Sequence, residues 1–117
     1  MGLHHKLCHT LGGTFDLPHA EVHAVVLPHA LRYNANAAPK AMARIAKALM
    51  VADAPLGVFE LARAHGAPVS LKAIGMPVGG LDQAAELAVS KQYPNPRPLE
   101  RTALRGLLGR AFDGATP

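Results

Sequence analysis

The 117-residue sequence has a single cysteine, Cys8, and no tryptophan. One cysteine excludes an internal disulfide bond, and such cysteine usage is typical of a reducing compartment, so we expect a cytoplasmic protein. Aromatic residues are also scarce, with three phenylalanines and two tyrosines. The core must therefore be built from alanine, leucine and valine, which favours close helix packing over broad sheets.

Long apolar runs and clustered positive charge are missing as well. The longest apolar stretches, such as "AVVLP" and "ALMVA", are far too short to span a bilayer. The first residues are not a basic patch followed by an apolar block, so we expect no signal peptide. The net charge is +4, but the lysines and arginines are scattered along the chain. Nucleic-acid binding normally needs a clustered basic face. We therefore expect neither a membrane protein nor a nucleic-acid-binding protein.

The sequence does contain helical patterns that are separated by glycine and proline. Leucines at steps of four predict a helix over residues 2–11. We expect the two glycines at 12–13 to end this helix. A second helix is predicted over about residues 18–33. Because Pro28 lies inside it, we expect a kink or a local break near residues 24–28.

Further helices are predicted downstream of these two. They cover residues 39–52, 54–66, about 81–92 and about 98–112, with a short helix starting near Ser70. Three prolines keep the segment before the last helix extended, and no alternating strand pattern of useful length occurs. The predicted fold class is therefore all-α, a multi-helix bundle in a single helical domain over residues 1–117.

Four of the seven histidines lie within residues 4–19. His5 and His9 are four residues apart, so they share one face of the first predicted helix. His19 follows the predicted glycine turn, and a chain reversal there could bring it towards the other two. Taken alone, such histidines are more often ordinary, partly buried residues than ligands.

The order His5-x3-His9-x9-His19, followed by "LPHALRYN", resembles the signature of the iron-containing alcohol dehydrogenase superfamily. Within that superfamily, "GLHHKLCHTLGGTFDLPHAEVHAVVLPHAL" and "NPRPLERTALRGLLGRAF" are most similar to maleylacetate reductases, and the resemblance covers essentially the whole chain. It implies the all-helical C-terminal domain of an oxidoreductase whose N-terminal α/β domain binds NADH or NADPH. Because no strand followed by a glycine-rich turn is predicted, we expect a fragment that lacks this nucleotide-binding domain.

The resemblance also implies roles for individual residues. His5, His9 and His19 would be catalytic: they would bind substrate carboxylates and donate a proton while hydride is added. The substrate would be a small dicarboxylate, maleylacetate, which is reduced to 3-oxoadipate in the degradation of aromatic compounds. His4 and Tyr93 would contact this substrate, although packing of Tyr93 against the proline-rich loop is an equal alternative.

A metal is a further implication that we do not favour. In metal-dependent members of the superfamily, His5 and His19 match two of four ligands to iron or zinc, and an upstream Asp and His complete the set. Those upstream residues are not in this chain, and maleylacetate reductases are described as needing no metal. Two alternatives stay open: part of a metal-dependent alcohol or hydroxy-acid dehydrogenase, or a non-catalytic module that binds Zn²⁺ or Ni²⁺ through His5, His9 and His19.

The remaining candidates receive structural interpretations. We expect His23 and His29 to be helix-face residues, His65 to be an exposed residue at a helix end, and Cys8 to fill space in the core. Arg97 is expected to be structural more than substrate-binding. Without its nucleotide-binding partner the chain should be inactive, and its exposed apolar surface should cause self-association or marginal solubility. We also expect a homo-oligomer.

Overall fold

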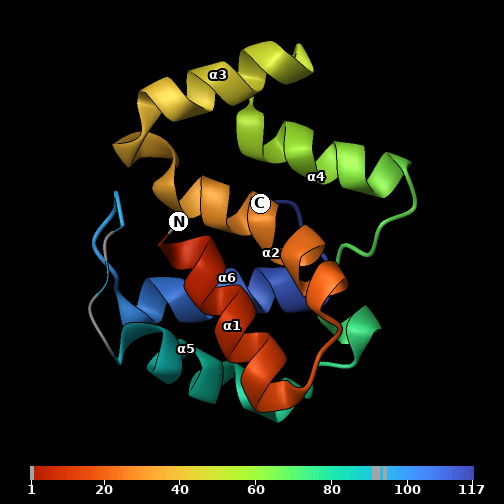
Figure 1. Cartoon of the computed structure of the whole chain (residues 1–117), viewed down its shortest axis with the longest axis vertical. Helices are drawn as coiled ribbons and strands as arrows, with labels where there is room; N and C mark the ends of the chain where they lie inside the picture. Colours follow the sequence, from red (N-terminus) through yellow and green to blue (C-terminus); the bar gives the residue numbers. More distant parts are fainter. Residues whose placement is uncertain (1, 91–92, 94) are drawn as a thin grey trace.

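The computed structural model describes residues 2–90, 93 and 95–117 and confirms the all-α class (Figure 1). No strand occurs in this described part of the chain. Its helices are, in order, α1 (Leu3–Phe15), α2 (His19–Asn34), η1 (Ala35–Ala37), α3 (Pro39–Leu49), α4 (Ala54–Ala64), η2 (Lys72–Ile74), η3 (Val78–Gly80), α5 (Leu81–Val89) and α6 (Arg101–Asp113). None of the helices in these residues is long and apolar enough to cross a membrane.

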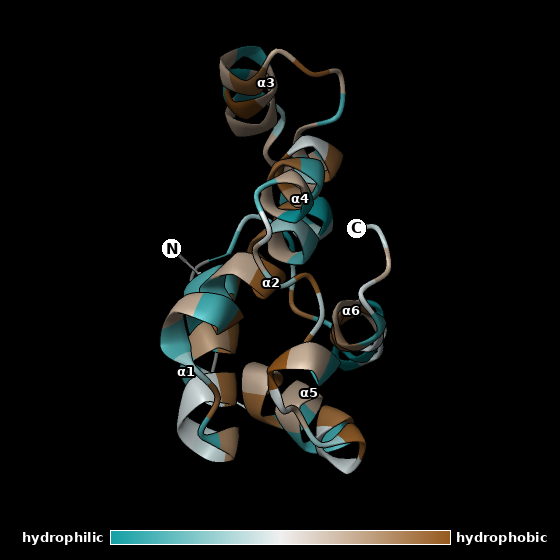
Figure 2. Ribbon diagram, turned by 90° about the vertical axis from the view of Figure 1, so that its right-hand side faces the viewer, coloured by the Kyte–Doolittle hydropathy of each residue, from teal (hydrophilic) through white to brown (hydrophobic). Residues whose placement is uncertain are grey.

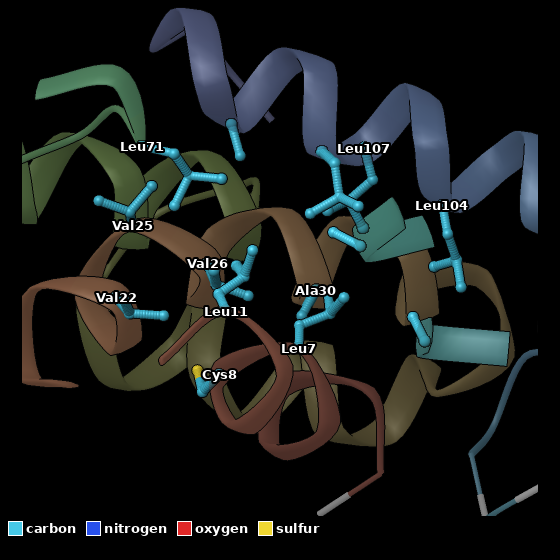
Figure 3. Close-up of a cluster of buried hydrophobic side chains, with 14 of the residues drawn as sticks. Leu7, Cys8, Leu11, Val22, Val25, Val26, Ala30, Leu71, Leu104 and Leu107 are labelled. Atoms are coloured by element: carbon cyan, nitrogen blue, oxygen red, sulfur yellow. The ribbon is translucent and has the colours of Figure 1, made fainter. Parts of the chain in front are cut away.

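The core lies between α1, α2, α5 and α6, which pack against one another (Figure 1). The α1 leucines at steps of four are completely buried, as the predicted helical stripe requires. They share one apolar cluster with leucines of α6, and Figure 3 shows Leu104 and Leu107 projecting from α6 into that cluster. Each buried leucine contributes about 1.5–3 kcal/mol of transfer free energy relative to an exposed one.

The α3–α4 hairpin extends from one end of this core (Figure 2). It joins the rest of the molecule mainly through contacts between α4 and α2, and α3 contributes no buried residue. Asp53 caps α4 because its carboxylate accepts a hydrogen bond from the Leu56 backbone N–H. The fold therefore separates a packed four-helix part, which carries the histidines at the chain start, from a peripheral hairpin.

The prediction that Gly12 and Gly13 end the first helix is wrong. α1 continues to Phe15, and the chain leaves the helix at Asp16, which adopts the left-handed conformation with φ 53°. Each glycine lowers the stability of a helix interior by about 1 kcal/mol. The last turn still forms, because Leu11 is fully buried and Phe15 packs against the core.

Of the kink or local break expected near Pro28, the break does not occur, because α2 is one continuous helix from His19 to Asn34. Proline removes one helical hydrogen bond. Pro28 is itself buried, and the turns on either side are held in the core by Val25 and Tyr33. Tertiary packing therefore overrides the local preference.

The later helices begin and end within a few residues of the predicted positions. α3 stops at Leu49 because Met50 adopts a left-handed conformation with φ 58°. The short helix expected near Ser70 is η2, and α5 and α6 follow as predicted. The expected extension of α5 over residues 91–92 lies outside the described residues.

Candidate active-site face

His5 and His9 lie on the exposed face of α1, opposite its buried leucine stripe. Their ring centroids are 6.5 Å apart and the ring planes are only 12° from parallel. This geometry follows from their spacing, since residues four apart are neighbours on a helix surface. Packing does not require imidazoles at exposed positions, so both rings are available to a ligand.

His19 is the first residue of α2 and is exposed. The turn formed by residues 16–18 brings α2 back beside α1, and Pro18 precedes the helix in an extended conformation without a side-chain cap. The His19 ring centroid lies 4.3 Å from that of His23, one helical turn later. The N-terminus of a helix favours an anionic ligand, because its first N–H groups have no helical acceptor.

His4 occupies a different position from its neighbour His5. It is half-buried, its Nε2 lies 3.2 Å from the His23 carbonyl oxygen, and its ring meets the His23 ring edge-on at 5.0 Å between centroids. Burial lowers the pKa of His4 below its ordinary value. His4 and His23 thus join α1 to α2, and His19 continues this row of rings at the surface.

Cys8 is buried beside this row, as expected of a residue that fills space in the core. Burial raises the pKa of its thiol to about 12, because desolvation penalises the thiolate. The Cys8 sulfur and one ring nitrogen from each of His4 and His23 all lie within 4.8 Å of one another. Within residues 2–90, 93 and 95–117, this is the only group of three metal-ligating side chains that lie so close together.

The catalytic set inferred from the family resemblance has a different arrangement. His5 pairs with His9 and His19 pairs with His23, but His5, His9 and His19 are not a three-donor group of that kind in the described part of the chain. A metal ion on His5 and His19 would find no third histidine, cysteine or carboxylate close to both among the described residues. The described residues therefore do not make a complete metal site at these positions.

Tyr93 has an intramolecular partner. Its hydroxyl donates a hydrogen bond of 2.9 Å to the Ala88 carbonyl oxygen at the end of α5, and burial raises the pKa of the phenol to about 12. Arg97 lies over the Tyr33 ring at 4.0 Å and donates to the Tyr33 carbonyl oxygen at 3.3 Å. These contacts agree with the structural alternative for both residues, in which they hold the proline-rich loop on the bundle.

His29 lies on a face of α2, as expected, but that face is the buried one, and the side chain is only 1% exposed. Neither ring nitrogen has a hydrogen-bond partner among the described residues, and burial lowers the pKa of His29 to about 4. The sequence contained a signal for this burial: His29 continues the stripe that starts at Val22 and includes Val26. His65, by contrast, is exposed just after α4, as expected.

The sequence and the fold match a known family. Residues 1–112 match the C-terminal part of the Fe-containing alcohol dehydrogenase family, and this chain belongs to that family. It is 63% identical over 117 residues to the maleylacetate reductase of Burkholderia cepacia. The aligned region is 100% of this chain and 33% of that relative. The chain therefore spans about one third of the length of the curated relatives that it matches.

Solved structures agree with this assignment. The maleylacetate reductase from Agrobacterium tumefaciens is similar with a TM-score of 0.95 and 54% identity, over 100% of this chain and 33% of that protein. A 1,3-propanediol oxidoreductase is similar with a TM-score of 0.84 and 30% identity, over 96% of this chain and 33% of that protein. These likenesses confirm the predicted family and the helical architecture of its C-terminal part.

Proposed function

We propose that these residues form the substrate-binding side of a maleylacetate reductase, which reduces maleylacetate to 3-oxoadipate with NADH or NADPH. The observation that carries the proposal is the exposed face of His5, His9 and His19 in a chain 63% identical to such a reductase along its whole length. As further parts of this proposal, the 117 residues act as one helical domain beside a nucleotide-binding domain, in a cytoplasmic homo-oligomer.

The chemistry of the face suits a dicarboxylate. Histidine is the side chain that changes charge near neutral pH, so an imidazolium can pair with a carboxylate and then release a proton. His19, at the N-terminus of α2, would bind a carboxylate where the helix also favours negative charge. His5 and His9 would orient the substrate and protonate carbon, so that one hydride and one proton add across the carbon–carbon double bond.

The nicotinamide cofactor supplies the hydride when it is bound. The described residues contain no strand followed by a glycine-rich turn, which is the usual cradle for a dinucleotide pyrophosphate. Cofactor binding would therefore depend on a nucleotide-binding domain outside these 117 residues. It follows that the chain alone should neither bind NADH tightly nor turn over maleylacetate.

A chimeric enzyme tests this proposal. The matching 117 residues of the Burkholderia cepacia reductase would be replaced by this chain, and NADH oxidation would be followed with and without maleylacetate. We expect oxidation that depends on maleylacetate in the chimera, and no change in NADH fluorescence with the isolated chain. A folded chimera that binds NADH but leaves maleylacetate unreduced would overturn the proposal, as would tight NADH binding by the isolated chain.

A metal-dependent alcohol or hydroxy-acid dehydrogenase is the second candidate. It is supported by the family resemblance, which implies metal-ligand roles for His5 and His19, and by the likeness to a 1,3-propanediol oxidoreductase. The same chimera distinguishes the two candidates. Activity that survives chelation supports the reductase, whereas activity that chelation abolishes and Fe²⁺ or Zn²⁺ restores supports the metal enzyme.

A further inference from the structure

We propose that His4, Cys8 and His23 form a thiolate-containing metal site between α1 and α2, which binds Zn²⁺ or another thiophilic divalent cation. One donor atom from each residue lies within 4.8 Å of the other two. These residues are not the ones that match metal ligands of the family. The site also does not depend on maleylacetate reduction, so it can be tested separately.

The local structure explains why these three side chains meet. His4 and Cys8 are one turn apart on α1, so their side chains project from neighbouring positions on the same side of the helix. His23 comes from α2, which packs along α1. Figure 3 shows the Cys8 sulfur at the edge of the buried cluster, away from Leu104 and Leu107 of α6. The thiol thus lies at the back of the site, and the two half-buried imidazoles lie nearer the surface.

A hydrogen bond already orients one of the proposed ligands. His4 Nε2 lies 3.2 Å from the His23 carbonyl oxygen. When Nε2 carries the proton and donates it to this oxygen, the lone pair of the ring is on Nδ1. Metal-binding histidines typically donate their second ring N–H to a backbone carbonyl or a carboxylate, which sets the tautomer and the ring direction. In that tautomer, His4 has the secondary contact expected of a metal ligand.

The donor set suits a borderline-soft cation. Zinc binds Cys sulfur at about 2.3 Å and His nitrogen at about 2.0–2.1 Å in tetrahedral sites, so the three donors would move roughly an ångström closer together on binding. Cys8 loses its proton to solvent as the sulfur–metal bond forms, and no oxidation takes place. Water can occupy the fourth position, as in open zinc sites.

Cobalt titration distinguishes this site from adventitious binding at the exposed histidines. Co²⁺ added to the 117-residue chain, under a non-thiol reductant, should give a near-ultraviolet thiolate-to-cobalt charge-transfer band that saturates at one equivalent. Zn²⁺ should then displace the cobalt and remove the band. A Co²⁺ ion held by His5 and His9 alone gives no such band, because those residues supply no sulfur.

Variants of single ligands complete the test. Cys8→Ala should abolish the band, and His23→Gln should weaken Co²⁺ affinity about tenfold or more, whereas the control His9→Gln should leave both unchanged. His23 is half-buried, so its variant should keep the wild-type circular dichroism even if Cys8→Ala unfolds. The proposal is overturned if the wild type gives no band, if a folded His23→Gln variant binds as tightly as the wild type, or if His9→Gln loses the band.

Discussion

The guanidinium of Arg97 lies over the ring of Tyr33, 4.0 Å from its centroid, and also donates a hydrogen bond to the Tyr33 carbonyl oxygen. The Tyr33 hydroxyl is engaged as well: it donates to the Pro98 carbonyl oxygen at 2.6 Å and accepts from the Glu100 backbone N–H at 3.1 Å. One buried tyrosine near the end of α2 thus holds the loop that leads into α6. The loop and α2 should therefore unfold together.

Tyr33→Phe should lower the free energy of unfolding by about 1–3 kcal/mol, because it leaves a carbonyl and an N–H of the loop without their partner. Urea unfolding followed by circular dichroism measures the change. Tyr93→Phe is the matched control, since among the described residues it removes one hydroxyl contact, to Ala88, and should have a smaller effect. Equal losses in the two variants would contradict a special role for Tyr33.

Gly80 provides a steric test of the packing between α1 and η3. A Cβ atom at Gly80 would lie 2.5 Å from Cε1 and 2.8 Å from Cζ of the Phe15 ring. Gly80→Ala should therefore destabilise the protein by about 1–3 kcal/mol through overpacking. Gly79→Ala is the control, because a Cβ there meets no neighbouring atom of the described residues within 4 Å. Thermal unfolding of both variants gives the comparison.

A double mutant identifies the contact responsible. If the Phe15 ring causes the strain, Phe15→Leu should cost less in the Gly80→Ala background than in the wild type, because the smaller side chain relieves the overlap. The two substitutions would then show a coupling free energy. Strictly additive effects would mean that the strain arises elsewhere, for example at Met76, whose Cε lies 3.3 Å from the same Cβ position.

His29 should make the stability depend on pH. Burial, with a smaller contribution from the positive charge of Arg110, lowers its pKa from 6.5 to about 4. The unfolded chain therefore binds the proton more readily. The stability that neutral His29 contributes is complete above about pH 6.5 and is lost as pH falls towards 4, with a loss of about 2 kcal/mol by pH 5.

His29→Leu tests this dependence with a side chain of similar size. Urea unfolding near pH 7.5 and near pH 5 should show a smaller loss of stability in the variant than in the wild type. His65→Gln removes an imidazole from an exposed position. Its unfolding free energy should change with pH as that of the wild type does. If His29→Leu loses as much unfolding free energy between pH 7.5 and pH 5 as the wild type, protonation of His29 does not cause the loss of stability in acid.

The exposed histidines should affect activity without affecting stability. In the chimeric reductase, His9→Gln should reduce maleylacetate-dependent turnover by about 10²–10⁴-fold, the range typical of a lost general acid. The unfolding free energy should change by less than about 0.5 kcal/mol, because the side chain is exposed and outside the core. A large loss of stability together with a small loss of turnover would assign His9 a structural role instead.

Much of the fold could be predicted because the helices are amphipathic. The leucine stripe of α1 and the apolar patterns of the later helices depend only on the 3.6-residue period and on which residues avoid water. Two predicted helix interruptions that do not occur both came from local rules at glycine and proline. Gly12 and Gly13 do not end α1, and Pro28 does not interrupt α2, because burial of neighbouring side chains outweighs a local cost of a few kcal/mol.

In the candidate site, the sequence likewise predicted contacts within one helix but not contacts between helices. The four-residue spacing by itself placed His5 beside His9, because both residues belong to one helix. The spacing of His4 and Cys8 was equally visible, but their third partner, His23, comes from another helix.

The sequence by itself determined an all-helical chain with a histidine-bearing first helix, since these features depend on local periodicity and on the identity of nearby residues. Only the tertiary structure decided which histidines are exposed, that buried His29 has no hydrogen-bond partner among the described residues, and that Arg97 and Tyr33 hold the proline-rich loop. These outcomes depend on how separate helices and loops pack, and packing is a property of contacts between residues that are distant in the sequence.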